Sequence, residues 1–208
     1  MAICTVGGFT SGQLRSCHVG IASCTVGTRG HPNSHPGGVN EKSSMASVTA
    51  TVVPVSAVES HLRPDLFISE LRSRKKSSVL EELAAALHAA RVARRHDAVL
   101  DALKRREALG STGIGKGIAV PHARSTLIAE RALLIARSAK GVEFDSLDGG
   151  PTHLLFLIVA PPLERDPIYL KLVAEIVRST RLARTRQKLL DAASFAAVRE
   201  ILVEAGRD

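Results

Sequence analysis

Residues 107–123 read EALGSTGIGKGIAVPHA, a segment in which a glycine-rich loop leads through a short apolar run to a histidine. Pro121 fixes its own φ and favours extended backbone at Val120, so the pattern predicts a short strand over residues 118–121. We expect His122 to leave the end of that strand in a defined direction. A neutral imidazole is a nucleophile near pH 7, and a hydrogen bond at one ring nitrogen decides which nitrogen can react. The segment therefore makes His122 a candidate nucleophile.

The loop before the histidine has the composition of a phosphate-binding segment. Glycines at three alternating positions, Gly113, Gly115 and Gly117, allow backbone N–H groups to approach an anion without hindrance from side chains. Arg106 before the loop and Arg124 after the histidine carry charges that can hold phosphoryl oxygens. Phosphoryl transfer depends mostly on positioning and on charge stabilisation of this kind. Two interpretations of His122 remain open at this point: a phosphate site, with neither a metal nor a cofactor, or a structural histidine whose hydrogen bonds are satisfied in the core or at the surface.

Two better-known glycine-rich motifs are excluded. Residues 110–117, GSTGIGKG, nearly match the P-loop pattern, but Gly117 stands where a hydroxyl side chain would hold magnesium. A P-loop also follows a strand and precedes a helix, whereas here a charged helical stretch comes first and a strand follows. The dinucleotide-binding pattern fails because Gly113 and Gly115 lack the third glycine of that fingerprint.

Two amphipathic helices are predicted upstream of the loop. Ser78 and Glu81 form a capping box that opens a helix over residues 79–91. Asp97 is placed to cap a second helix, which Gly110 would end. The apolar positions repeat at the spacing of one buried helix face. They are Leu80, Leu83, Ala84 and Leu87 in the first helix, and Val99, Leu100, Leu103 and Leu109 in the second, which spans residues 98–109.

Two strands are predicted after the histidine, over residues 132–138 and 153–160. The second is apolar throughout, as expected for a central strand that is buried on both faces. Strands and helices mix along the chain, so the predicted class is α/β or α+β. We expect a single domain over residues 58–208, in which helices cover a β-sheet.

Two further helices complete the predicted domain. Asp166 and Pro167 form an N-cap and N1 pair for a long helix over residues 168–182. A last helix starts near Ser194 and ends before Gly206.

Residues 1–57 are rich in Gly, Ser, Thr and Val and show no sustained periodicity, so they are predicted to be a disordered extension. An acid-poor start of this kind also resembles a transit peptide, and Met45 offers an alternative start that would make the upstream residues an annotation artefact. No secretory signal is predicted, because no apolar run of about 7–15 residues occurs in this segment. The three cysteines, Cys4, Cys17 and Cys24, lie in this segment without paired metal-binding spacing, and the cysteine-free remainder fits a reducing cytosol.

The chain has a net charge of +8, which raises the question of a nucleic-acid partner. The basic residues alternate with apolar ones, as on solvated helix faces, and aromatic residues for base stacking make up only 3% of the chain. No stretch of about 20 apolar residues occurs, so membrane insertion is not expected. We predict a cytoplasmic protein that binds no nucleic acid.

The spacing around His122 resembles the active-site signature of the phosphotransferase-system enzyme IIA family, of the fructose/mannitol and nitrogen-regulatory type. The signature runs from Glu107 through Ile114 and Gly115 to the segment IAVPHA. Further segments between residues 62 and 205 are similar to family landmarks. They are KSSVLEELA (76–84), the pair Arg106-Glu107, and GVEFDSLDGGPT (141–152) with the strand after it.

The resemblance implies a function and a set of partners. His122 would accept a phosphoryl group from a histidine-containing phosphocarrier protein of the HPr type, with Arg106 stabilising the phosphate. It would then pass the group to a separate IIB protein, or act as a phosphorylation-dependent regulator of a target protein. The lack of an attached IIB or membrane segment favours the nitrogen-regulatory subtype. The family fold is a mixed sheet flanked by helices, so the resemblance implies a mixed β-sheet with helices on both sides over residues 58–208.

The chain departs from the family pattern at two positions. Ala123 stands where glycine is usual, and Asp166 aligns with the family's second histidine at the start of the long helix. A carboxylate there would repel phosphohistidine, which makes a non-catalytic, phosphorylation-sensitive binding regulator the alternative. The remaining histidines are interpreted as structural or solvated. They are His18, His31, His35, His61, His88, His96 and His153.

Overall fold

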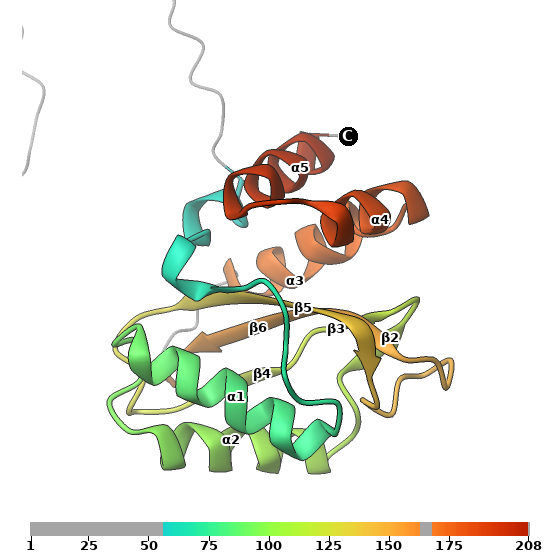
Figure 1. Cartoon of the computed structure of the whole chain (residues 1–208). Helices are drawn as coiled ribbons and strands as arrows, with labels where there is room; N and C mark the ends of the chain where they lie inside the picture. The colour runs from blue at the N-terminus through green and yellow to red at the C-terminus, as the bar shows by residue number, and fades with distance from the viewer. Residues whose placement is uncertain (1–55, 163–167, 208) are drawn as a thin grey trace, which may run out of the picture. The chain divides into compact units, whose positions relative to one another are not determined.

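The computed structural model describes residues 56–162 and 168–207, so the extension predicted for residues 1–57 lies almost entirely outside it. Within the described residues, six strands form one sheet in the order β1-β5-β6-β3-β2, and β4 also pairs with β6 (Figure 1). β6 is antiparallel to β5 and parallel to β3 and β4, so the sheet is mixed, as predicted. The strands are β1 (Phe67–Ile68), β2 (Gly113–Gly115), β3 (Ile118–Ala119), β4 (His122–Arg124), β5 (Ala132–Val142) and β6 (Thr152–Ala160).

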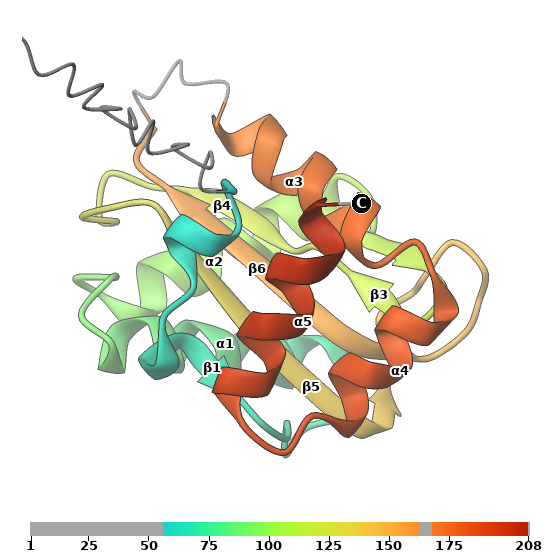
Figure 2. The same cartoon turned by 90° about the horizontal axis from the view of Figure 1, so that it is seen from above.

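Helices cover both faces of the sheet, which confirms the predicted architecture. α1 and α2 lie on one face, and α3, α4 and α5 lie on the other (Figures 1 and 2). Of the helices in the described part of the chain, none combines the length and the apolarity that crossing a membrane requires. The helices are α1 (Lys76–Ala89), α2 (His96–Ala108), α3 (Ile168–Ser179), α4 (Ala183–Asp191) and α5 (Phe195–Arg207), with 3-10 turns η1 (Glu59–His61) and η2 (Pro64–Leu66) before β1.

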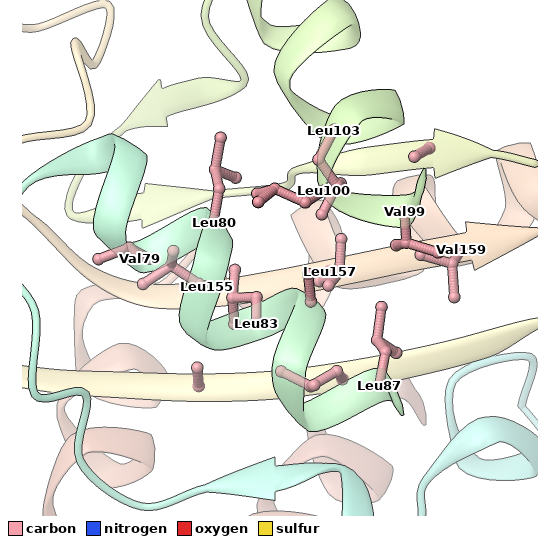
Figure 3. Close-up of a cluster of buried hydrophobic side chains, with 14 of the residues drawn as sticks. Val79, Leu80, Leu83, Leu87, Val99, Leu100, Leu103, Leu155, Leu157 and Val159 are labelled. Carbon is pink, nitrogen blue, oxygen red and sulfur yellow. The ribbon is translucent and has the colours of Figure 1, made fainter. Parts of the chain in front are cut away.

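β6 is the centre of the core because its side chains pack against helices on both faces. One set, packed with leucines and valines of α1 and α2 (Figure 3), comprises Leu155, Leu157 and Val159. The alternate set, which packs with α3, α4 and α5, comprises Leu154, Phe156 and Ile158. Each fully buried side chain of this size contributes about 1.5–3 kcal/mol. Burial on both faces explains the uninterrupted apolar run and confirms the predicted central strand.

α1 begins one turn earlier than predicted. Its N-cap is Lys75 and its first residue is Lys76, so Ser78 lies inside the helix and the predicted capping box is wrong. The additional turn places the Lys76 ammonium 2.9 Å from the carboxylate of Glu107, at the end of α2. A contact between two helices therefore overrides the local capping signal.

α2 also begins early, at His96, and Asp97 in its first turn pairs with Arg95 rather than capping the helix. Gly110 follows the helix with a φ of 144°, which only glycine adopts readily, so the predicted end is confirmed. Leu109, predicted to be buried, is 85% exposed because it lies beyond the last residue of the buried helix face.

The C-terminal helices divide differently from the prediction. The helix expected over residues 168–182 ends at Ser179, and a separate helix, α4, follows it. Only Thr185 and Leu189 are buried along α4, so its apolar pattern is too sparse to predict a helix. α5 continues through Gly206 instead of ending before it.

Candidate active site

His122 is the first residue of β4, whereas the sequence predicted that the strand would end before it. β3 and β4 both run parallel to β6, and the ladder is interrupted between them at Val120 and Pro121. Proline has no backbone N–H to donate, which accounts for the interruption. Because His122 pairs with Ile158 of β6, the central strand fixes the backbone of the histidine.

Two hydrogen bonds determine the tautomer of His122. Its Nδ1 lies 3.1 Å from the carbonyl oxygen of Val120, which can only accept, so Nδ1 carries the proton. Arg106 donates from Nε to Nε2 of the histidine over 2.7 Å, so Nε2 presents a lone pair. Arg106 is held in turn by a 3.0 Å bond from Nη1 to the carbonyl oxygen of Gly110. The nitrogen with nucleophilic character is therefore Nε2.

The surroundings of His122 keep the imidazole neutral. Burial is the largest cause that lowers its pKa below the usual value. The positive charges of Arg106 and Arg124 lower the pKa further, while the hydrogen bond to Val120 and the carboxylate of Glu107 oppose them. The net direction is downward, so the ring is uncharged at pH 7, the state in which Nε2 can attack.

Tyr169, in the first turn of α3, is a neighbour of His122 that the sequence did not predict. The two rings meet edge to face with their centroids 5.6 Å apart, and the guanidinium of Arg124 lies 5.2 Å from the tyrosine ring centre. Burial raises the pKa of Tyr169, so its phenol stays protonated. A signal was available, since Tyr169 is the only tyrosine in the chain and follows the predicted helix start. Asp166, which was aligned with the family's second histidine at the start of this helix, lies outside the described residues.

Glu107 anchors the end of α2 to the loop. It accepts hydrogen bonds from the backbone N–H and the hydroxyl of Thr112, at 2.9 and 2.7 Å. Lys76 lies 2.9 Å from the same carboxylate and also pairs with Asp145 at 2.8 Å. Burial acts to raise the pKa of Glu107, but the bonds from Thr112 and Lys76 outweigh it and lower the pKa. A charged Glu107 therefore fixes both the loop and the helix that carries the arginine of the site.

The three glycines predicted to bind phosphate form a strand and a tight turn. Gly113 lies in β2, which pairs with β3, and Gly115 and Gly117 have φ values of 86° and 77°. Within the turn, Lys116 donates its backbone N–H to the carboxylate of Asp148 over 2.6 Å. In the described part of the chain, none of the three glycines bonds to the imidazole. Instead, the three glycines form part of β2 and of the turn that sets the register of β2 against β3.

The arrangement combines the parts that phosphoryl transfer requires: a neutral, oriented imidazole and cationic groups beside its reactive nitrogen. Arg106 and His122, both predicted, are in direct contact. No group of three or more histidine, cysteine or acidic side chains suited to a metal ion occurs between residues 56 and 162 or between 168 and 207.

Comparison with known proteins gives a consistent result. Residues 60–205 match the family described as "Phosphoenolpyruvate-dependent sugar phosphotransferase system, EIIA 2". The chain is 36% identical over 137 residues to the fructose-specific EIIA component of Haloferax volcanii, and the match covers 66% of this chain and 88% of that protein.

Solved structures share the fold. The nitrogen regulatory protein IIA-Ntr from Neisseria meningitidis superposes with a TM-score of 0.64 and 27% identity, covering 71% of this chain and 99% of that one. Enzyme IIA of the mannitol system from Escherichia coli, in a complex with phosphorylated IIB, gives 0.57 and 17%, covering 69% and 97%, and shows the fold alone. The resemblance seen around residues 107–123 is confirmed. The chain belongs to the EIIA 2 family of the phosphoenolpyruvate-dependent sugar phosphotransferase system and is one of its phosphoryl carriers.

Proposed function

We propose that His122 is the residue of this carrier that becomes phosphorylated, and that Nε2 is the attacking atom. One observation carries the proposal: the hydrogen bond to Val120 places the proton on Nδ1 and leaves the lone pair on Nε2, where Arg106 meets it. The lowered pKa of His122 supports the same conclusion, because a protonated ring has no lone pair with which to attack.

The proposed step balances without a further reactant. The Nε2 lone pair forms a bond to phosphorus while the bond between phosphorus and a histidine nitrogen of an HPr-type phosphocarrier breaks. The electron pair of the broken bond remains on the donor nitrogen. In the second step, a nucleophile of a separate IIB protein attacks phosphorus and returns the lone pair to Nε2. The Nδ1 proton stays on its bond to Val120 throughout.

Arg106 has two tasks in this proposal. Before transfer its Nε–H occupies the Nε2 lone pair, so the guanidinium must move aside when phosphorus approaches. Its donors then bond to the equatorial phosphoryl oxygens, whose charge must be stabilised. Arg124, whose guanidinium lies against the ring of Tyr169, supplies a second positive charge near His122.

Tyr169 is proposed to be a positioning residue. Its ring restricts rotation of the imidazole, and an edge-to-face pair of this kind contributes about 0.5–1.5 kcal/mol. The contribution of Asp166 to the site stays a prediction, as does direct phosphate contact by Gly113, Gly115 and Gly117. The 113–117 turn contributes by holding the strand that precedes the histidine.

We also propose that the functional domain comprises residues 58–208 and that residues 1–57 are an extension, which the family match over residues 60–205 supports. Relatives of both the sugar-transport and the nitrogen-regulatory kind match this chain, so the preference for the regulatory subtype stays a prediction. Addition of a sugar-specific IIB protein discriminates between them, because only a sugar-type carrier would lose its phosphate to it. No observation favours the binding-regulator alternative.

The test is phosphoryl uptake followed by intact mass. The full chain is mixed with phosphoenolpyruvate, enzyme I and HPr, and wild type is compared with His122→Ala and with His153→Ala as a matched control. We expect one acid-labile phosphate on wild type and on His153→Ala, and none on His122→Ala. An unmodified, folded wild-type protein would contradict the proposal and would favour the binding-regulator alternative.

A further inference from the structure

A hollow lies where α3, α4 and α5 meet, at the opposite end of α3 from Tyr169. Ser179 is the tenth residue after Tyr169 along α3, which corresponds to a rise of about 15 Å. The hollow has a volume of about 330 Å³, and we call it the α3–α5 pocket. α5 contacts both α3 and α4, and Figure 2 shows the three helices on one face of the sheet. Its charged lining residues are Arg178, Arg181, Arg184, Lys188 and Glu204.

The charges around this pocket are unbalanced, with four cations against one carboxylate. Within the described residues, Arg181, Arg184 and Lys188 form no ion pair or hydrogen bond through their side chains. Arg184 and Lys188 stand four residues apart on α4, a spacing at which like charges repel. Arg178 uses one nitrogen to donate to the carbonyl oxygen of Gly206, over 2.8 Å. A bound anion would relieve this repulsion.

A buried hydroxyl provides an independent sign of a ligand. Ser179 lines the pocket, is only 2% exposed, and its hydroxyl oxygen finds no hydrogen-bond partner among the described residues. Buried polar groups in proteins are nearly always hydrogen-bonded, so an unpartnered one requires an explanation. A hydroxyl can donate to an anion, and a ligand in the pocket would satisfy it once the Ser179 side chain rotates to expose its oxygen, which has almost no accessible surface in the structure.

The first turn of α4 forms part of the same wall. Its N-cap, Leu182, gives the helix no side-chain hydrogen bond, and no acidic residue lies in the first turn. The start of this helix therefore keeps backbone N–H groups without a side-chain acceptor, and helix N-termini favour negative charge.

We propose that the α3–α5 pocket binds a small anion of the phosphate class, held by Arg181, Arg184 and Lys188 with Ser179 as a hydroxyl donor. The wall also contains apolar side chains, Leu182, Ile201 and Ala205, which fit the organic part of a phosphorylated metabolite. The site is separate from His122, and its occupancy does not depend on the phosphoryl-transfer proposal.

The test is an NMR titration of the full ¹⁵N-labelled chain with pyrophosphate, in wild type and in His122→Ala. We expect saturable shifts of amides at 179–188 and 201–205 in both proteins. The double variant Arg181→Ala/Arg184→Ala should lose these shifts. The matched double variant Arg72→Ala/Arg94→Ala, which removes two exposed arginines elsewhere, should keep them.

Further arms distinguish specific binding from diffuse attraction. Ser179→Ala should weaken binding about tenfold, because a hydrogen bond to a charged group contributes roughly that factor. ADP in place of pyrophosphate shows whether the apolar wall contributes: tighter binding indicates an organic phosphate, and weaker binding indicates an inorganic one. The proposal is wrong if wild type shows no saturable shifts at the pocket, or if both double variants weaken binding equally. If the Arg181→Ala/Arg184→Ala variant fails to fold, the residues whose amide signals shift in wild type are sufficient to test the proposal.

Discussion

His122 and His153 are both half-buried, and a backbone carbonyl orients each ring. His122 lies in β4 and pairs near the C-terminal end of β6, whereas His153 lies near the N-terminal end of β6 itself. In each, Nδ1 bonds to a backbone carbonyl oxygen, that of Val120 at 3.1 Å and that of Ser138 at 2.8 Å. In the neutral form of each ring the proton is therefore on Nδ1 and the lone pair is on Nε2. The tautomer alone does not make a reactive site.

The difference lies around Nε2. At His122 this nitrogen meets the guanidinium of Arg106, and Arg124 and Tyr169 lie close by. At His153 the ring lies against the backbone of Gly141, and within the described residues it makes no second hydrogen bond. The backbone therefore sets the tautomer, and side chains from other elements supply the chemistry.

Removal of Arg106 should have the largest effect, because it takes from His122 the side chain that His153 lacks. In Arg106→Ala, we expect the initial rate of phosphoryl uptake to fall about 100-fold, because one preorganised donor to a developing charge contributes about that much. Arg105→Ala is the matched control, since Arg105 is the exposed neighbour on the same helix. Equal rates for the two variants, measured by rapid-quench mass spectrometry, would remove Arg106 from the mechanism.

Two carboxylates hold the loop before His122 at its two ends: Glu107 accepts from Thr112, and Asp148 accepts from Lys116. Glu107→Ala leaves Lys76 and Thr112 without their carboxylate, so we expect the free energy of unfolding in urea to fall by about 2 kcal/mol. Asp148→Ala, at the exposed turn near His153, should cost less, because water replaces its hydrogen bonds. If the Asp148 variant lost more stability, Glu107 would not be the principal anchor.

Tyr169 offers a smaller effect. Tyr169→Ala should slow uptake roughly threefold to tenfold, as expected for the loss of an edge-to-face contact. Tyr169→Phe keeps the ring and should retain nearly the wild-type rate. A slow Phe variant in the same uptake assay would instead indicate that the hydroxyl takes part.

A change of pH should alter the rate of phosphoryl uptake less than any of these substitutions. Folding lowers the pKa of His122, so the protonated ring is disfavoured in the folded protein relative to the unfolded chain, where histidine titrates near pH 6.5. The stability from this shift is present above about pH 6.5 and is lost as the pH falls through that value toward the folded pKa.

Uptake should accordingly stay level from pH 7.5 to about 6.5. Ring-proton NMR should show that Arg106→Ala raises the pKa of His122, because a neighbouring positive charge is removed. A titration midpoint for wild-type His122 above that of histidine in an unfolded peptide would contradict the downward shift of its pKa.

The local parts of the site were predictable because local geometry determines them. Pro121 and the glycine pattern mark His122, and the end of α2 places Arg106 before the loop. Tyr169 was not found, because packing of α3 across the sheet brings it to the histidine.

The same reasoning applies to the fold. The apolar run of β6 predicted a central strand because burial on both faces leaves a continuous pattern. The start of α1 was missed because the pairing of Lys76 with Glu107 is a contact between helices, which capping rules do not contain. α4 was missed because a helix with few buried positions carries little periodic signal.

The bond between His122 and the carbonyl of Val120 has a consequence for how this protein can change over generations. No point mutation deletes a main-chain carbonyl, so a lineage that loses Arg106 keeps a histidine with its proton already in place. Loss of transfer is then a one-residue event, and so is its recovery. Active and inactive forms of this carrier can therefore differ by a single substitution.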